Sequence, residues 1–171
     1  MFDRKRLISS VQKGINTDRR RLLAVLAGAT GGAIAIGIME AFSVSTAFPL
    51  MAIPFATSIV TVLGSPAAEP AQPRALIGGH LVATLAGLVV VKLVGPSPWA
   101  AAVAVGLAIA AMHATGTFHP PAGIDALIVV THGLSWGFLL APVAAGAVLL
   151  TLCAWAWHNL VARTSWPRQW L

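Results

Sequence analysis

The chain has 171 residues, of which 57% are hydrophobic and only 9% are charged, well below the roughly 25% charged share of a soluble domain. This composition excludes a water-soluble globule. Seven of the eleven Lys and Arg residues lie within the first 21 positions, beside a long apolar stretch, which is typical of the cytoplasmic flank of a membrane span and gives no reason to expect a nucleic-acid partner.

Four apolar segments, taken in chain order, approach the roughly 20 residues that a transmembrane helix needs: 20–42, 75–94, 98–115 and 137–160. Two less regular apolar segments lie between them. The segment 45–63 contains Pro49 and Pro54, and the segment 119–131 opens with a double proline. Because proline removes a backbone donor and clashes with the preceding turn, we expect both segments to form broken or re-entrant helices.

The order of long, broken and long segments occurs twice, which predicts an internal repeat. The first copy covers about 22–94 and the second about 98–160, with Met39-Glu40-Ala41 at the place of Met112-His113-Ala114. The expected fold is therefore an all-α integral membrane bundle of two tandem repeats, with four clear spans and two short membrane helices. A basic segment, 1–21, precedes this single transmembrane domain, 22–160, and a tail, 161–171, follows it.

Two topologies agree with the basic residues, which place both termini in the cytoplasm, as in a bacterial inner membrane. If the short segments are re-entrant, there are four crossings, the copies are parallel, and Lys92 faces the cytoplasm. If the short segments cross, there are six crossings, the copies are inverted, and the loop before Arg74 is cytoplasmic. The sequence leaves both open. Its many Gly and Ala residues predict close helix packing and a possible homo-oligomer.

Ionisable side chains inside a membrane are costly and usually face the bundle interior or a water-filled cavity. Five residues qualify as candidates: Glu40, His80, His113, His119 and Asp125. Glu40 lies near a span end and could simply be hydrated. For His80, a hydrogen bond between helices is as good an interpretation as a ligand role.

The most informative stretch is Thr115 to Asp125, which contains His119-Pro120-Pro121-Ala122-Gly123. Proline is tolerated in the first helical turn, so a short helix could begin here with its N-terminus, an anion-binding end, inside the protein. His119 could donate to the anion or carry a proton. Thr57 and Ser58 offer hydroxyl donors in the first copy. The alternative is that both prolines merely turn a loop.

Metal binding and enzymatic chemistry have less support. His113, His119, Asp125 and His132 are suitable ligand types, but they form no compact metal-binding motif. The single cysteine, Cys153, and the serines have no recognisable catalytic partner pattern. We therefore predict no metal, no cofactor and no enzymatic activity.

Two motifs carry a resemblance to a known family. His119-Pro120-Pro121-Ala122-Gly123 resembles the signature of the HPP family of integral membrane proteins, and Gly64-Ser65-Pro66, Ala71-Gln72-Pro73-Arg74 and Ile77-Gly78-Gly79-His80-Leu81 resemble the family's other characteristic stretch. The resemblance implies four transmembrane segments and transport of a small anion, with nitrite the leading substrate. Ile124 and Asp125 depart from the small residues that usually follow the signature, and an ionised Asp125 facing the site would repel an anion.

We therefore predict passage of a small monovalent inorganic anion, most simply nitrite, across a lipid bilayer. The expected binding residues are His119, Pro120, Pro121, Ala122, Gly123, Thr57 and Ser58. The expected gating or proton-coupling residues are Asp125, His113, His80, Glu40 and Arg74, of which Arg74 could instead mark topology or cap a helix. The alternatives are a membrane scaffold that transports nothing and a membrane-embedded metalloenzyme.

Overall fold

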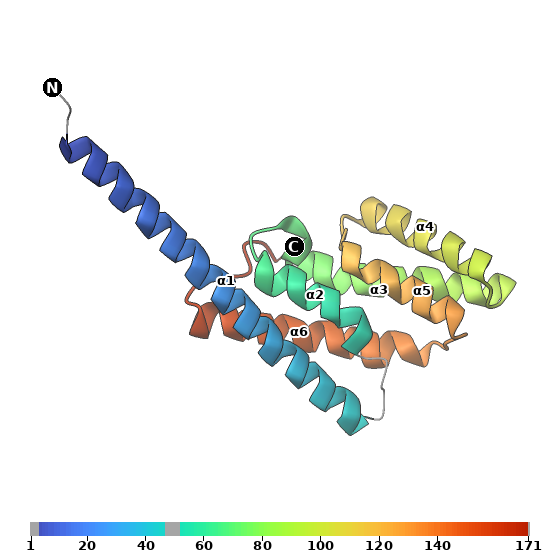
Figure 1. The fold of residues 1–171 in the computed structure, drawn as a ribbon. Helices are drawn as coiled ribbons and strands as arrows, with labels where there is room; N and C mark the ends of the chain where they lie inside the picture. The colour runs from blue at the N-terminus through green and yellow to red at the C-terminus, as the bar shows by residue number, and fades with distance from the viewer. Residues whose placement is uncertain (1–3, 47–51, 171) are drawn as a thin grey trace.

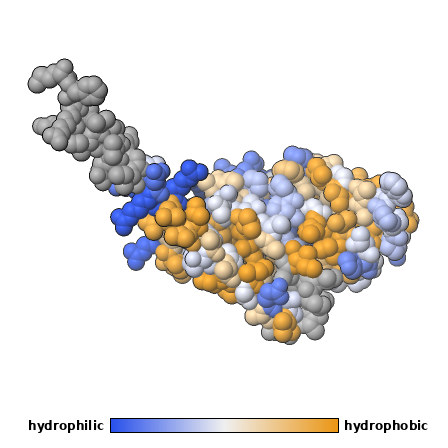
Figure 2. Space-filling view, viewed as in Figure 1, coloured by the Kyte–Doolittle hydropathy of each residue, from blue (hydrophilic) through white to orange (hydrophobic). Residues whose placement is uncertain are grey.

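The computed structural model describes the backbone of residues 4–46 and 52–170, and the side chains of residues 16–44 and 53–170. All regular elements in these ranges are helical, which confirms the predicted all-α class. The expected break at Pro49 lies outside the described residues. Apolar side chains cover much of the surface facing the viewer in Figure 2, as lipid-facing helices require.

Four helical segments are long and apolar enough to cross a membrane, as predicted. They are α1 (Arg4–Thr46, with its apolar part at Asn16–Val44), α3 (Pro73–Val94), α4 (Pro98–Thr115) and the continuous stretch Leu139–Val161. Proline begins both α3 and α4, where a missing N–H costs least. Gly116 ends α4 in the left-handed region, at φ 64°, a conformation that glycine adopts without strain.

The last span is less regular than its sequence suggested. It consists of a π-helical turn, η3 (Leu139–Ala144), followed by α6 (Ala145–Ala156) and a second π-helical turn, η4 (Trp157–Val161). Within η3, Ala141 leaves the helical region at φ −133° and ψ 99°. Because Pro142 follows it and disfavours a helical conformation in the residue before it, this proline explains a kink that was not predicted.

Two short helices lie among the long ones, as expected. The first is α2 (Ala52–Gly64), which carries Pro54 in its first turn. The second is α5 (Gly123–Thr131), preceded by a 3-10 turn, η2 (Pro120–Ala122). At 1.5 Å per residue these α-helices are about 20 Å and 14 Å long, shorter than the hydrocarbon core of about 30 Å. Neither therefore spans that core by its α-helical residues alone, and each has an exposed face as well as a buried one.

Each helix runs opposite to the one before it in the chain (Figure 1). One end of the bundle, which we call the basic end, joins the start of α3 to the end of α4 and to the C-terminal segment. There Arg74 Nη2 donates to the Thr115 carbonyl at 3.1 Å, and Arg168 N donates to Gln72 Oε1 at 2.8 Å. Lys92 lies at the other end of α3. This alternation matches the six-pass arrangement, and the re-entrant one is not confirmed.

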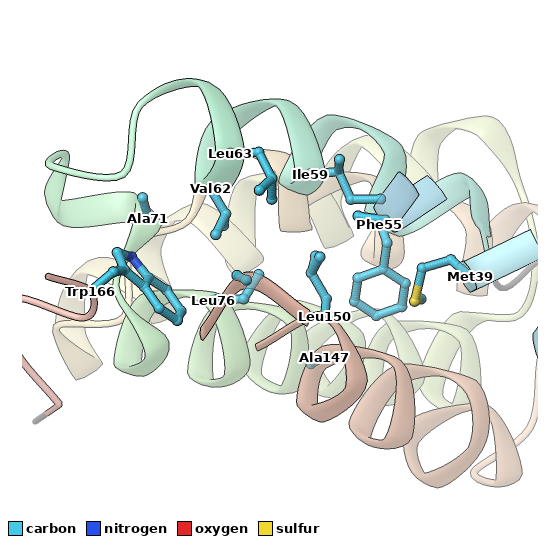
Figure 3. Packing of buried hydrophobic residues seen from close by; sticks show 12 residues of the cluster. Met39, Phe55, Ile59, Val62, Leu63, Ala71, Leu76, Ala147, Leu150 and Trp166 are labelled. Atoms are coloured by element: carbon cyan, nitrogen blue, oxygen red, sulfur yellow. The ribbon is translucent and has the colours of Figure 1, made fainter. Parts of the chain in front are cut away.

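Three apolar clusters hold the bundle together. The largest joins α1, α2, α3 and α6 through side chains such as Met39, Phe55, Leu76 and Leu150, which project toward one another in Figure 3. A second, rich in alanine, joins α3, α4 and α5, and a third lies between α3, α5 and η3. The repeat relationship between the two halves stays a prediction.

Candidate functional site

Two glycines of α3 make room for the segment that leads into the double proline. A Cβ atom at Gly78 would lie 2.5 Å from Thr117 Cγ2, and one at Gly79 would lie 2.6 Å from His119 Cβ. The segment from Gly116 to His119 can therefore lie directly against α3. Since Gly79 is six residues into α3, His119 lies about 9 Å along that helix from its first residue.

A continuous chain of buried polar side chains connects three helices at this point. Ser58 Oγ of α2 lies 2.8 Å from His80 Nε2 of α3 and 2.8 Å from His119 Nε2. His80 Nδ1 lies 2.6 Å from Asp125 Oδ2 of α5. All four side chains, Asp125, His80, Ser58 and His119, have 0% exposure. We call these four residues the histidine network.

The far end of the network is anchored by a backbone carbonyl. His119 Nδ1 donates to the Pro70 carbonyl at 2.7 Å, and Pro70 belongs to a 3-10 turn, η1 (Glu69–Ala71), between α2 and α3. A carbonyl only accepts hydrogen bonds, so the proton on Nδ1 is fixed. The Nε2 atom of His119 therefore faces Ser58.

The Asp125 end of the network is enclosed and only partly satisfied. Thr84 lies one turn beyond His80 on α3 and is also buried, and neither Thr84 Oγ1 nor Asp125 Oδ1 has a hydrogen-bond partner. The ring of Phe55 lies 4.6 Å, centroid to centroid, from the His80 ring. Apolar packing thus shields this side of the network.

The predicted anion site at the helix N-terminus needs correction. Pro120 and Pro121 have no N–H, the Ala122 N–H donates to the His119 carbonyl at 2.9 Å, and the Gly123 N–H is bonded to the carbonyls of the two prolines. No backbone donor of residues 120–123 is left for an anion. The polar groups that remain here belong to side chains.

The predicted side chains fall into two groups, those that lie together in the interior and those that are exposed. The structure brings Ser58, His80, His119 and Asp125 together, whereas Thr57 and Glu40 are exposed. His113 is also exposed, and its ring stacks on Phe118 with 4.1 Å between the centroids.

Arg74 has the capping role that was the alternative to anion attraction. Its hydrogen bond to Thr115 satisfies a carbonyl at the end of α4. Its guanidinium also fills the space beside Gly116, where a Cβ atom would lie 2.9 Å from Nη2.

Sequence reasoning did not predict that the Ser58 hydroxyl would lie against the His80 ring. The order Asp125, His80, Ser58 repeats the atom order of a Ser-His-Asp triad, from carboxylate to Nδ1 and from Nε2 to Oγ. The three residues come from three helices, so no spacing in the sequence could have revealed them. Among the described residues, no group of three or more His, Cys, Asp or Glu side chains could hold a metal ion.

A cavity of about 620 Å³ opens at the basic end. Its polar lining includes Arg21 of α1, His158 of η4 and Thr164 of the C-terminal segment, and the end of α2 at Leu63 and Gly64 forms another wall. Along α2, Ser58 lies five residues from Leu63, or about 8 Å. The cavity therefore approaches the histidine network without including it.

Comparisons with known proteins match the sequence of this chain to one family. Residues 16–167 match the transmembrane region of the HPP family. Two transmembrane proteins of Dictyostelium discoideum are 40% and 36% identical to the chain, each over 124 residues and 68% of the chain. The matched parts cover 40% and 44% of those relatives' own lengths. No solved structure matches the chain. The chain belongs to the HPP family of transmembrane proteins.

Proposed function

We propose that the chain transports a small monovalent anion across a lipid bilayer, with nitrite as the leading substrate. The observation that carries the proposal is the histidine network. A connected set of ionisable side chains with 0% exposure is expensive inside a membrane protein and typically marks an ion or proton pathway. The family resemblance implies the same class of substrate.

The available donors favour an anion over a cation. Ser58 and the two histidines can all present O–H or N–H groups, and Asp125 is the one carboxylate among them. Its Oδ2 atom is already held by His80, so the ionised carboxylate does not face Ser58 directly. We therefore propose that Ser58 and His119 contact the anion and that His80 and Asp125 act behind them.

The route to this site would begin at the cavity of the basic end. Arg21, rather than Arg74, supplies the cation that attracts an anion there. We assign this end to the cytoplasm, because Arg21, Arg74 and Arg168 gather at it and cytoplasmic flanks are basic. From the opposite side, Phe55 closes the approach to His80.

The test is uptake by purified protein in liposomes, with nitrite, nitrate, formate and bicarbonate compared. We expect protein-dependent uptake of nitrite above that of protein-free liposomes. His119→Gln should lower this uptake by about tenfold, the loss expected of a hydrogen bond worth about 1.4 kcal/mol. His132→Gln is the matched control, because His132 is exposed and bonds only within its own helix end.

Uptake of none of these anions would contradict the proposal and favour the scaffold alternative. Equal nitrite uptake by wild type and His119→Gln, at equal protein density, would remove His119 from the pathway.

A second candidate function is acyl transfer, because Ser58, His80 and Asp125 have the atom order of a nucleophilic triad. Two facts favour transport. Ser58 has 0% exposure, and His119 Nε2 occupies a second side of its Oγ at 2.8 Å. A fluorophosphonate probe separates the two: transport predicts no labelling of Ser58, whereas labelling that is lost in Ser58→Ala would favour the enzyme.

A further inference from the structure

The histidine network contains four short hydrogen bonds, of 2.6–2.8 Å, and each needs one proton. The bonds join Asp125 to His80, His80 to Ser58, Ser58 to His119, and His119 to the Pro70 carbonyl. With Asp125 ionised and both imidazoles neutral, the network has only three protons, one each on Ser58, His80 and His119. Two Nε2 lone pairs would then compete for the single Ser58 proton. A fourth proton satisfies every bond.

The net charge of the network leads to the same number of protons, four. A network with 0% exposure is stable only if its net charge is close to zero, because an uncompensated charge in the interior costs several kcal/mol. With four protons, the single negative charge of Asp125 is cancelled, whichever residue carries the extra proton. The Asp125 Oδ1 atom has no hydrogen bond, and this vacancy costs less when the carboxyl shares a proton.

A fifth proton changes what Ser58 can do. With both histidines protonated, His80 Nε2 and His119 Nε2 both donate to Ser58 Oγ, which has two lone pairs to accept them. The Ser58 hydroxyl proton is then released from the network. Its nearest acceptor is the Pro54 carbonyl, at a long 3.4 Å. The network now carries one positive charge, and its Ser58 O–H is held only by this long contact, which leaves it able to donate to a ligand.

We propose that the histidine network binds its anion together with one proton, so that the transported pair is electrically neutral. The inference rests on the proposed function and names its coupling ion. The single positive charge of the five-proton state matches a monovalent anion, and the released Ser58 hydroxyl donates to it. Without the proton, Ser58 has no free donor and an anion would leave an uncompensated negative charge.

No other ionisable group among the described residues forms a hydrogen bond with the network. Those on the elements packed around the network point elsewhere: Glu40, Glu69, Lys92, His113 and His132 are exposed, Arg74 bonds the Thr115 carbonyl, His158 Nε2 bonds the Val62 carbonyl, and Cys153 is half-buried in α6.

The experiment measures nitrite uptake under two separate driving forces. In wild-type proteoliposomes, an outside-acidic pH gradient should raise the protein-dependent initial rate. A potassium diffusion potential of either sign should leave it unchanged, since the pair carries no charge. Protein-free liposomes must be subtracted, because nitrous acid crosses bilayers unaided.

Asp125→Asn provides the decisive variant. Asparagine keeps an oxygen acceptor for His80 Nδ1 but removes the negative charge, so the five-proton state that releases the Ser58 hydroxyl carries two positive charges instead of one. One anion then leaves a net positive charge, so uptake by this variant should be slower than in wild type and, unlike wild type, should respond to an inside-negative potential. Glu69→Gln, which removes an exposed carboxylate, should behave like wild type.

The outcomes separate the two proposals. Wild-type uptake that follows the membrane potential and ignores the pH gradient would overturn the proton pairing while leaving anion transport intact. Absence of protein-dependent uptake would overturn both. Because the wild-type measurement stands alone, the proposal stays testable even if Asp125→Asn does not fold.

Discussion

His80 and Asp125 are 45 residues apart in the chain and lie on different helices, yet they share the shortest hydrogen bond of the histidine network, at 2.6 Å. Neither side chain is exposed. Each side chain therefore supplies most of what offsets the free-energy cost of burying the other. Asp125, which was expected to repel an anion if it were ionised and faced the site, is paired with a histidine.

This pairing predicts strong coupling between the two residues. Asp125→Ala and His80→Ala should each lower the free energy of unfolding by about 3–5 kcal/mol, the cost of breaking a buried pair from one side. The double variant should lose clearly less than the sum of the two, because the second change removes a group already left unpaired. Unfolding in bicelles measures all three. Additive losses would show that the contact contributes nothing of its own.

The close approach at Gly79 predicts a steric effect. In Gly79→Ala the new Cβ would lie 2.6 Å from His119 Cβ and 2.9 Å from the Thr117 carbonyl oxygen. Overpacking of this kind costs about 1–3 kcal/mol, and displacement of His119 should also lower nitrite uptake. Gly106→Ala is the control, since nothing lies within 4 Å of its Cβ, and it should keep full stability and uptake. Equal behaviour of the two variants would contradict the packing described.

Gln72 predicts a different kind of loss. Its Nε2 donates to the carbonyls of Pro66 and Ala68, and its Oε1 accepts from Arg168 N. Gln72→Leu leaves these groups unpaired, at about 1–3 kcal/mol each where they are buried. The C-terminal segment should detach, so trypsin should cut at Arg168 faster than in wild type. Gln169→Leu, which changes an exposed side chain, is the control and should be cut at the wild-type rate. If Gln72→Leu is also cut at the wild-type rate, the contact between Gln72 and Arg168 does not hold the segment.

The six-pass arrangement predicts which loops share a side of the membrane. In a Cys153→Ser background, an impermeant maleimide should label Ala67→Cys and Ser165→Cys from one side, and Pro96→Cys from the other. Four crossings with re-entrant helices would instead place Pro96→Cys and Ser165→Cys together, opposite Ala67→Cys. Labelling of right-side-out and inverted vesicles distinguishes these patterns directly.

The fold could be predicted from the sequence further than the site could. Apolar length defines a membrane helix almost independently of its neighbours, so the four spans and the short helix after Pro121 were predicted close to their observed positions. The kink at Ala141 was missed because Pro142 lies inside an otherwise continuous apolar run. The direction of the short helices depends on how they pack against the long ones. The positions of Lys92 and Arg74 in the sequence could not decide it.

The site shows where such reasoning stops. The structure brings four of the predicted residues together, but the prediction placed the anion on backbone donors of residues 120–123, and those donors do not exist or are already bonded. A double proline starts a helix by giving up the same N–H groups that an anion would need. The partnership of Ser58 with His80 and His119 is set by contacts between helices and has no linear signature.

The central claim is that Ser58 joins His80 and His119 inside the membrane, and nitrogen NMR of isotopically labelled histidine in bilayers measures this most directly. The account predicts that both Nδ1 atoms are protonated, that both Nε2 signals are hydrogen-bonded, and that the Nε2 signals shift in Ser58→Ala but not in Thr61→Ala, whose hydroxyl bonds the Thr57 carbonyl on the same helix. Imidazole signals that exchange freely with water and are unchanged by Ser58→Ala would contradict it.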